Sequence, residues 1–423
     1  MSISQATERL AIDGGEPAVR RPLERYKGAA MIGEEEKRAV MEVLDSRSLF
    51  RYYGPHLLGK VAAFETDFAR YLDVPFVAAS SSGTAALRAG LAAMGVGAGD
   101  EVIVPAITFI ASVGAVVAQH AIPIFAECDD LLCLDPAGIE PLLTERTRAI
   151  MPVHLTGVAA DMDPIMELAR RHGIGVIEDT AQACGSWYKD RRLGSIGDMG
   201  AFSFQLEKNI TSGEGGALAT ADEELYKRAV KFSDQGGQFP IQSGGIRDLV
   251  GGEPFLGENL RMTEICGAIL GCQLARLDDI LHRVEHARTT VLAGLSDLPL
   301  EFGRQDPGRN RHALGIGFQL PDPEQASRVV KALQAEGVPA GLVYGGKPVY
   351  ANRQILEQRT FTRACPFSCS CTDHRKVTYK MGMCPRTEEL LARYVGIGLG
   401  PFFTDDDLHD IVHGIRKVIT QLL

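Results

Sequence analysis

The chain lacks the features that mark nucleic-acid-binding, membrane-spanning and exported proteins. Its 54 aspartates and glutamates outnumber its 44 lysines and arginines, and no basic cluster offsets the repulsion between a net charge of −10 and a phosphate backbone. The longest nearly uncharged stretch, residues 102–125, contains prolines and polar residues and cannot supply about 20 continuous apolar helical positions. The first ten residues have no basic start followed by an apolar run. We expect a cytoplasmic protein that binds neither nucleic acid nor membrane.

A regular cysteine framework is also missing. Nine cysteines, an odd number, are scattered through 423 residues, which favours free thiols in a reducing compartment over disulfides. One group of possible zinc ligands does lie close together in the sequence: Cys365, Cys369, Cys371 and Cys384, with His374 nearby. Because their spacing is not the paired two-residue form, we expect free thiols in a loop on the substrate side and no metal.

What the chain does have is the alternation of an α/β protein. With 45% hydrophobic and 23% charged residues over this length, two or three globular domains are expected. Between about residues 76 and 220, short apolar runs alternate with helical patterns, as in a mostly parallel sheet covered by helices. We expect strands over 77–79, 101–104, 122–125, 149–153, 175–177 and 201–204, and helices over 85–94, 110–119, 136–143 and 163–172.

A smaller second domain is expected in the C-terminal third of the chain. Apolar positions at helical spacing fill residues 260–295, and short strands and helices mix after Pro299. We place a large domain with its N-terminal segment over residues 1–276 and a small domain over residues 277–423. Between residues 233 and 258, glycine pairs interrupt a segment too long for a simple connection, which predicts an active-site or interface loop.

Two charged residues follow expected strands, where ligands of open α/β sheets bind. Asp179 follows the strand over 175–177, and Lys208 follows the strand over 201–204. Each has a plainer explanation on its own, because an aspartate after a strand is often a helix cap and a lysine is usually a solvated surface group. Pyridoxal phosphate, however, requires both a lysine for a Schiff base and an acid beside its pyridine nitrogen.

A candidate phosphate site precedes the alanine-rich helix over 85–94. Ser80-Ser81-Ser82-Gly83-Thr84 leads from a strand into that helix, so backbone N–H groups, the helix dipole and hydroxyls converge there. The same run also serves as an N-cap and turn, and in isolation that explanation is the stronger one. The order of such segments along the whole chain has to decide between a phosphate site and a simple helix cap.

That order is distinctive. It runs through Ser82-Gly83-Thr84, Pro105-Ala106-Ile107-Thr108-Phe109, Glu178-Asp179-Thr180-Ala181-Gln182, and Phe202-Ser203-Phe204 through Lys208 to Gly213-Glu214-Gly215-Gly216. The chain resembles the DegT/StrS-type sugar aminotransferases over nearly its whole length. This resemblance implies a fold type I pyridoxal-phosphate enzyme, with a mostly parallel seven-stranded sheet between helices and a smaller C-terminal α+β domain. It also implies a transaminase.

The resemblance gives each matching residue a role. Lys208 is the Schiff-base lysine and shuttles the proton between substrate and cofactor, and Asp179 takes the pyridine nitrogen. The other cofactor contacts are expected from Phe109 on the ring, Gln182 at the phenolic oxygen, and Gly83, Thr84 and Ser203 at the phosphate.

Residues 256–262 are similar to the family segment that reaches into the neighbouring subunit. The resemblance implies a homodimer with shared active sites, in which Asn259 contacts the partner's phosphate. Arg261 is expected near the substrate, since arginine suits bidentate carboxylate recognition, with an interface or surface ion pair as the alternative. His154 fits a substrate-site segment of the family, although a single histidine is more often a hydrogen-bonded structural residue.

The resemblance implies transfer of an amino group from glutamate or glutamine to a keto group on a sugar, a keto-octulosonate or a cyclitol. Leu49-Phe50-Arg51-Tyr52 is similar to amino-octulosonate transaminases, and Gly14-Gly15 to inosose and aminohydroxybenzoate enzymes. The departures from the family pattern, at Cys184, Gln205 and Glu207, remove no cofactor contact. Related sugar dehydratases carry histidine in place of Lys208, which argues against dehydration, and a cofactor-binding regulator without turnover is the other alternative.

Overall fold

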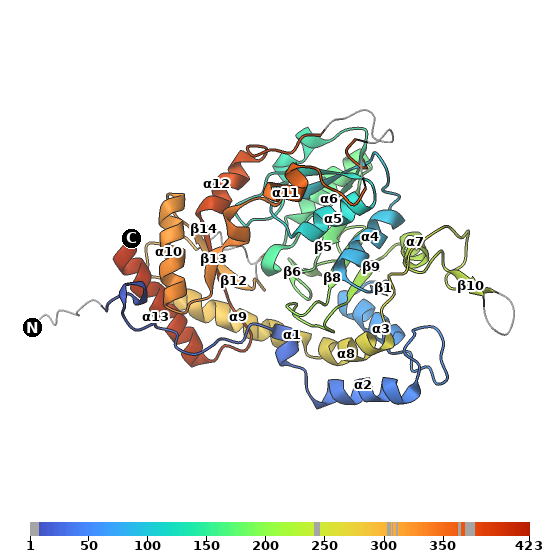
Figure 1. The fold of residues 1–423 in the computed structure, drawn as a ribbon, viewed down its shortest axis with the longest axis horizontal. Helices are drawn as coiled ribbons and strands as arrows, with labels where there is room; N and C mark the ends of the chain where they lie inside the picture. The colour runs from blue at the N-terminus through green and yellow to red at the C-terminus, as the bar shows by residue number, and fades with distance from the viewer. Residues whose placement is uncertain are drawn as a thin grey trace, which may run out of the picture.

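The computed structural model in Figure 1 describes residues 8–240, 246–302, 306, 308–309, 312–362, 365–368 and 377–423. Its larger part is built on a seven-stranded sheet ordered β1-β9-β8-β5-β4-β2-β3. β9 runs antiparallel to β1 and β8, and the other neighbours are parallel, which confirms the mostly parallel sheet. The strands are β1 (Phe76–Ser80), β2 (Glu101–Pro105), β3 (Ile122–Ala126), β4 (Thr147–Ile150), β5 (Gly175–Asp179), β8 (Met199–Ser203) and β9 (Gly216–Thr220).

Helices cover both faces of this sheet, and every residue of β2 and β3 is buried. In β2, Val102 and Val104 belong to the core formed with α4 (Gly83–Ala93) and α5 (Ile110–Ala118), whereas Ile103 belongs to the core formed with α6 (Met162–His172). Small residues bring α4 close to the sheet. A Cβ atom at Gly90 would lie 2.5 Å from Ile177 Cδ1, so a larger residue there would push the helix outward.

The helix expected over residues 136–143 is wrong. Two short 3₁₀ turns, η2 (Pro136–Gly138) and η3 (Glu140–Leu142), take its place. The physical reason is Pro141, which has no N–H to donate and whose ring would clash with the carbonyl of the preceding turn of an α-helix.

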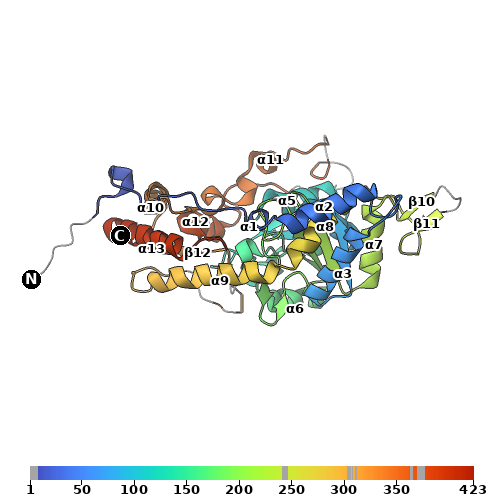
Figure 2. The same cartoon turned by 90° about the horizontal axis from the view of Figure 1, so that it is seen from below.

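The C-terminal part has a separate core around a three-stranded antiparallel sheet, which confirms the smaller α+β part of the fold. The sheet order is β12-β14-β13, from β12 (Gly315–Gln319), β14 (Tyr394–Gly398) and β13 (Ala340–Leu342). Figure 2 shows α9 (Leu277–Gly294) running from this part toward the large sheet. The other helices of this core are α10 (Pro323–Ala335) and α13 (Asp405–Leu422).

The N-terminal segment joins the two parts. Leu10 and Val19 are buried in the C-terminal core, where the Glu336 carboxylate accepts hydrogen bonds from the Ala11 and Ala18 N–H groups at 2.8 and 3.0 Å. The chain then crosses to the large sheet through α1 (Lys27–Ala30), α2 (Glu34–Ser46) and α3 (Lys60–Leu72). The division at residues 276 and 277 coincides with the start of α9 and stays a prediction.

Part of the glycine-rich segment forms a short ribbon of β10 (Gln238–Pro240) and β11 (Ile246–Asp248), which projects from the molecule beyond α7 (Glu223–Ser233) (Figure 1). Within the described residues, no helix combines the length and apolar character needed to cross a membrane. The remaining elements are η1 (Ala11–Asp13), η4 (Leu155–Gly157), β6 (Trp187–Tyr188), β7 (Arg191–Arg192), α8 (Glu264–Leu274), η5 (Val343–Gly346), η6 (Val349–Ala351), α11 (Arg353–Leu356) and α12 (Pro385–Arg393).

Candidate active site

A cavity of about 780 Å³ opens beyond the carboxyl ends of β1, β5 and β8. This is the edge at which open α/β sheets bind ligands. Seven of the residues singled out in the sequence line it together: Gly83, Thr84, Phe109, Asp179, Gln182, Ser203 and Lys208. His154, Asn259 and Arg261 do not line it.

Asp179 ends β5 and is buried at the floor of the cavity. Its Oδ2 accepts a hydrogen bond from Ser112 Oγ at 2.7 Å, and its Oδ1 accepts one from the Ala181 N–H at 3.1 Å. Burial raises the pKa of this carboxyl group, while the two hydrogen bonds and the nearby Lys208 ammonium oppose the rise. The site therefore holds a desolvated acid that a cationic partner would stabilise.

Lys208 lies in the tight turn that follows β8. Its N–H donates to the Gln205 carbonyl at 2.9 Å, and the Thr211 hydroxyl fixes the turn by donating to the Phe204 carbonyl at 2.9 Å. Burial lowers the pKa of the Lys208 amine, against the opposing effect of Asp179 and two glutamates. A lowered pKa increases the fraction of neutral amine, which is the form that attacks a carbonyl carbon.

The phosphate candidate and the N-cap prove to be the same structure. Ser82 caps α4 by accepting a hydrogen bond from the Ala85 N–H at 3.1 Å, while Gly83 and Thr84 begin the helix and line the cavity. A Cβ atom on Gly83 would come within 2.7 Å of Ser203 Cβ, so only glycine lets the helix start this close to β8. The free N–H groups of a helix N-terminus suit a phosphate.

Phe109 provides an exposed aromatic wall. Its side chain is 58% exposed although it lines the cavity, where a large apolar group gains little unless a ligand covers it. An aromatic wall, a buried acid, an amine of lowered pKa and a helix N-terminus thus meet in one cavity. These residues fit the ring, ring nitrogen, carbonyl and phosphate of pyridoxal phosphate.

Gln182 is held between two residues with left-handed backbone conformations. Its Nε2 donates to Tyr344 Oη at 3.0 Å, and its Oε1 accepts from the Thr156 N–H at 3.3 Å. Thr156 and Tyr344 have φ angles of 49° and 48°, which non-glycine residues adopt rarely. Burial raises the pKa of Tyr344 to about 12, so its hydroxyl keeps its proton. The sequence reasoning missed Tyr344, although the Gly345-Gly346 pair after it is a turn signal.

His154 lies beside the cavity with both ring nitrogens bonded to protein. Its Nε2 pairs with Glu178 at 2.9 Å, and its Nδ1 accepts from the Ala160 N–H at 3.1 Å. Both side chains are fully buried. A contact between His154 and a substrate would require one of these bonds to break, so the geometry favours a structural role for this residue.

Glu178 also fixes the loop before β8, because it accepts hydrogen bonds from the N–H groups of Gly194, Ile196 and Gly197 at 2.7 to 2.8 Å. Burial alone would raise the pKa of Glu178, but the bonds from His154 and these N–H groups outweigh burial and hold the pKa below its ordinary value. The carboxylate thus stabilises the fold above the ordinary glutamate pKa, and this stabilisation is lost as the pH falls through the lowered value.

Glu178→Ala is expected to destabilise the protein by roughly 3 kcal/mol or more, because it leaves several buried donors without acceptors. Urea unfolding measures the change. Glu140→Ala is the control, since the Glu140 side chain is 57% exposed and its ion pair with Arg171 is worth at most about 1 kcal/mol. Equal destabilisation by the two substitutions would contradict the role of Glu178.

Asn259 and Arg261 lie next to the phosphate candidate but outside the cavity. The Ser81 N–H donates to the Leu260 carbonyl at 2.7 Å, which holds their segment against the end of β1. The Arg261 guanidinium pairs with Asp234 and lies 5.1 Å from the Phe50 ring centroid. Asn259 is exposed. This arrangement matches the ion-pair alternative for Arg261 within a single chain.

A second cavity, of about 660 Å³, adjoins the first. Arg25, Gln182 and Tyr344 line both, and the second cavity continues to Arg288 on α9 and to β12 and β14. The two form one cleft between the large sheet and the C-terminal part. A substrate in this cleft would contact both parts of the molecule.

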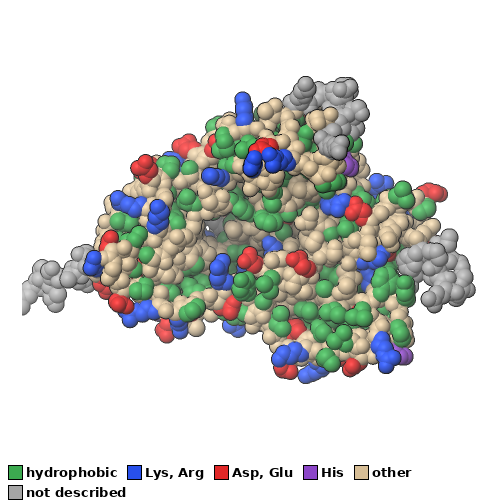
Figure 3. All heavy atoms as spheres, in the orientation of Figure 1, with side chains coloured by type: hydrophobic (Ala, Val, Ile, Leu, Met, Phe, Trp, Pro, Cys, Tyr) green, Lys and Arg blue, Asp and Glu red, His purple; other side chains and the backbone are tan. Residues whose placement is uncertain are grey.

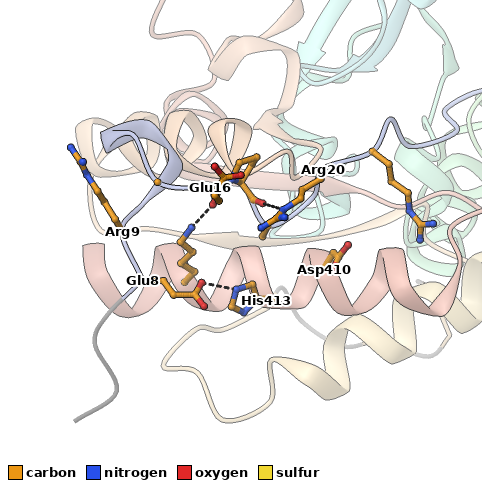
Figure 4. Close-up of a pocket in the computed structure, with 11 residues that line it drawn as sticks. Glu8, Arg9, Glu16, Arg20, Asp410 and His413 are labelled. Carbon is orange, nitrogen blue, oxygen red and sulfur yellow. Dashed lines mark hydrogen bonds and ion pairs between the residues drawn. The ribbon is translucent and has the colours of Figure 1, made fainter.

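A third cavity, of about 660 Å³, lies between the N-terminal segment and α13, away from all the predicted site residues (Figure 4). Several of its charged groups already have partners in the protein. His413 pairs with Glu8 at 3.0 Å, and Lys417 Nζ donates to the Glu16 carbonyl at 2.9 Å. We assign no chemistry to it.

The cysteine-rich loop can be followed only in part. Cys369, Cys371 and His374 lie outside the described residues, while Cys384 is a free thiol. Burial raises the pKa of Cys384 to about 12, so this thiol keeps its proton. Among the residues that the structure describes, no three candidate ligands are grouped for a metal ion.

Known proteins are similar to this chain in sequence and fold. The model of the DegT/DnrJ/EryC1/StrS aminotransferase family matches residues 30–373. The chain is 38% identical to the L-glutamine:2-deoxy-scyllo-inosose aminotransferase of Streptomyces lividus over 426 residues, which are 97% of this chain and 98% of that enzyme. It is 45% identical to the GDP-perosamine synthase of Caulobacter vibrioides over 222 residues, 52% of this chain and 58% of the synthase. The crystal structure of DesV from S. venezuelae is similar with a TM-score of 0.76 and 31% identity, covering 90% of this chain and 93% of DesV. The chain belongs to the DegT/DnrJ/EryC1/StrS aminotransferase family and is a pyridoxal-phosphate-dependent aminotransferase.

Proposed function

We propose that this aminotransferase moves an amino group from glutamate or glutamine to the keto group of a sugar, a keto-octulosonate or a cyclitol. The observation that carries the proposal is the meeting of Lys208, Asp179 and the N-terminus of α4 in one cavity that continues into a larger cleft. The names of the relatives support the substrate class, since one acts on an inosose and another makes GDP-perosamine.

In this proposal, bound pyridoxal phosphate supplies the electron sink for the carbon that loses or gains the amino group. Lys208 would hold the cofactor and would move a proton at that carbon. Asp179 keeps a proton on the pyridine nitrogen, and Ser112 keeps the carboxylate in place. Each of these steps depends on a desolvated site, which the buried position of Asp179 provides.

The remaining residues orient the cofactor. Phe109, Gly83, Thr84 and Ser203 line the same cavity. Phe109 would cover one face of the ring, and the other three would donate to the phosphate. Gln182 would contact the phenolic oxygen, and Tyr344 positions the Gln182 amide from the C-terminal side of the cleft. His154 acts indirectly, because it holds Glu178 and the end of the strand that carries Asp179.

The acceptor can be identified in a half-reaction. The enzyme is loaded with an amino group from glutamine or glutamate, freed of donor, and given one keto-sugar, keto-octulosonate or inosose at a time. Mass spectrometry should detect an aminated product from one of these classes. A loaded enzyme that aminates none of them would contradict the proposed substrate class while leaving the transaminase assignment intact.

A homodimer with shared active sites belongs to the same proposal. Figure 3 shows apolar side chains gathered over α2 and the neighbouring segments, where Met41 and Leu44 are 54% and 44% exposed. Leu256, in the segment that carries Asn259, is 98% exposed. Exposed apolar patches of this kind mark interaction surfaces. A cytoplasmic location also belongs to the proposal, and it is supported by the free thiols of Cys128, Cys133, Cys184, Cys266, Cys272 and Cys384.

If Asn259 completes the partner's phosphate site, two inactive variants should complement each other. Mixing Lys208→Ala subunits with Asn259→Ala subunits would create heterodimers with one intact and one doubly altered site. Turnover should return to about a quarter of the wild-type value, since statistical exchange gives half heterodimers, each with one working site. A mixture no more active than its parts, with subunit exchange verified by mass spectrometry, would show that Asn259 serves its own chain.

A further inference from the structure

The N-terminal segment packs directly on the turn that carries Lys208. The Gly28 N–H donates to the Lys208 carbonyl at 3.3 Å, and Gly28 is buried. A Cβ atom on Gly28 would lie 2.8 Å from the Thr211 nitrogen and 2.9 Å from Ile210 Cα. This close approach fixes the preceding residue, Lys27, at the wall of the cavity.

The Lys27 ammonium is close to the reactive lysine and has room for a further acceptor. Its Nζ donates to the Glu207 carbonyl at 3.2 Å, its one hydrogen-bond partner within the described part of the chain. Burial and the nearby Lys208 ammonium lower the pKa of Lys27 to about 8, against an opposing effect of the Glu207 carboxylate. An ammonium group has three N–H donors, so two remain for a ligand.

Arg25 presents a second cation on the same wall. It is exposed, it lines both cavities of the cleft, and it forms no ion pair with any residue that the structure describes. The N-terminus of α4 and Ser203 already offer donors for the cofactor's phosphate. Lys27 and Arg25 are therefore available to an anion other than that phosphate.

We propose that Lys27, assisted by Arg25, binds a carboxylate group of a substrate in the cleft. The proposal rests on the proposed function, because it concerns the substrates of the same site. The carboxylate has two possible sources, the amino-acid donor and a sugar-acid acceptor such as a keto-octulosonate. Charge-assisted bonds from an ammonium and a guanidinium suit either source.

The test compares Lys27→Met, Lys27→Arg and Arg25→Gln in the cofactor-loaded enzyme. The control is Lys331→Met, which removes an exposed lysine from α10. The first readout is the binding of glutarate, a five-carbon dicarboxylate without an amino group, by titration calorimetry. The second is the pair of half-reactions, with glutamine or glutamate as donor and with an inosose or a keto-octulosonate as acceptor.

If the donor supplies the carboxylate, Lys27→Met should weaken glutarate binding and raise the donor KM by about tenfold or more, with the inosose half-reaction unchanged. If the acceptor supplies it, glutarate binding should persist and only the keto-octulosonate half-reaction should lose efficiency. Either result supports the proposal. Lys27→Arg should retain most of the function in both cases, and Arg25→Gln should show a smaller effect in the same half-reaction.

Two results would overturn the proposal. In the first, Lys27→Met binds glutarate as tightly as Lys331→Met does and performs every half-reaction as efficiently. In the second, Lys27→Met loses efficiency equally with the neutral inosose and with the anionic substrates, or it retains the cofactor less well. Either outcome would indicate that Lys27 only supports the Lys208 turn. Glutarate binding remains measurable even if wild-type enzyme aminates no tested keto compound, so the failure of the proposed acceptor class is distinguishable.

Discussion

Lys208→Ala is expected to abolish covalent attachment of the cofactor and to lower kcat by about 10³-fold or more. Lys208 holds the cofactor and also moves the proton at the reacting carbon, so one substitution removes two functions. Lys27 also lines the cavity, but its backbone is fixed beside the Lys208 turn through Gly28, and we expect it not to replace Lys208. Borohydride reduction followed by peptide mass spectrometry measures the attachment.

The variant should still fold and still bind some cofactor noncovalently. The donors of α4, the Phe109 ring and Asp179 remain in place. Lys27→Met serves as the matched control, because it removes a neighbouring amine and should leave the reduced adduct on Lys208 unchanged. An adduct found on another lysine of the wild-type enzyme, or retained in Lys208→Ala, would refute the assignment.

Asp179→Asn is expected to lower kcat by about 10²- to 10³-fold with little loss of folded protein. The amide has the same shape: its oxygen can still accept from the Ala181 N–H, and its NH2 group can donate to the Ser112 hydroxyl. It carries no charge, however, to keep the pyridine nitrogen protonated. Because burial raises the pKa of Asp179, removing its charge also removes a desolvation penalty from the cofactor-free protein. The cofactor-free variant should therefore be at least as stable as the wild type.

Steady-state rates and thermal unfolding, each with and without cofactor, separate the two effects. Ser112→Ala is the intermediate case, since it removes one hydrogen bond from the carboxylate and leaves the charge. We expect a smaller loss of kcat, of about tenfold. Near-normal turnover by Asp179→Asn would rule out its role at the pyridine nitrogen.

The sequence predicts the parts of the site that depend on local order. Asp179 and Gly83 could be placed because a strand end and a helix start are visible in the hydrophobic pattern. In a parallel sheet, these ends meet at one edge, so their proximity follows from the fold class. The strand boundaries agree within a few residues for the same reason.

The contributions of distant segments could not be predicted in this way. Lys27 meets Glu207 across 180 residues of sequence, and Tyr344 meets Gln182 across 162. Neither lies in a periodic pattern, and both reach the cleft through the packing of the N-terminal segment and of the C-terminal part. Ser112 lies on α5, and its position in the sequence does not distinguish it from other small residues on the buried face of a helix.

His154 illustrates a different limit. The sequence places it correctly after a strand, but it does not reveal that Glu178 and the Ala160 N–H occupy both ring nitrogens. The side chain of Glu178 points away from the cleft while that of its neighbour Asp179 lines it, as alternation along a strand requires. A sequence pattern identifies both carboxylates and cannot assign their partners.

The most direct test of the account is a single half-reaction. Cofactor-loaded enzyme is mixed with L-glutamine or L-glutamate, without any keto acceptor, and its visible absorbance is followed while the released acid is analysed by mass spectrometry. The account predicts that the absorbance of the pyridoxal form gives way to that of the pyridoxamine form, with one keto acid released per active site, and that Lys208→Ala shows neither change at a comparable rate. Bound donor with an unchanged pyridoxal absorbance and no keto acid would contradict it.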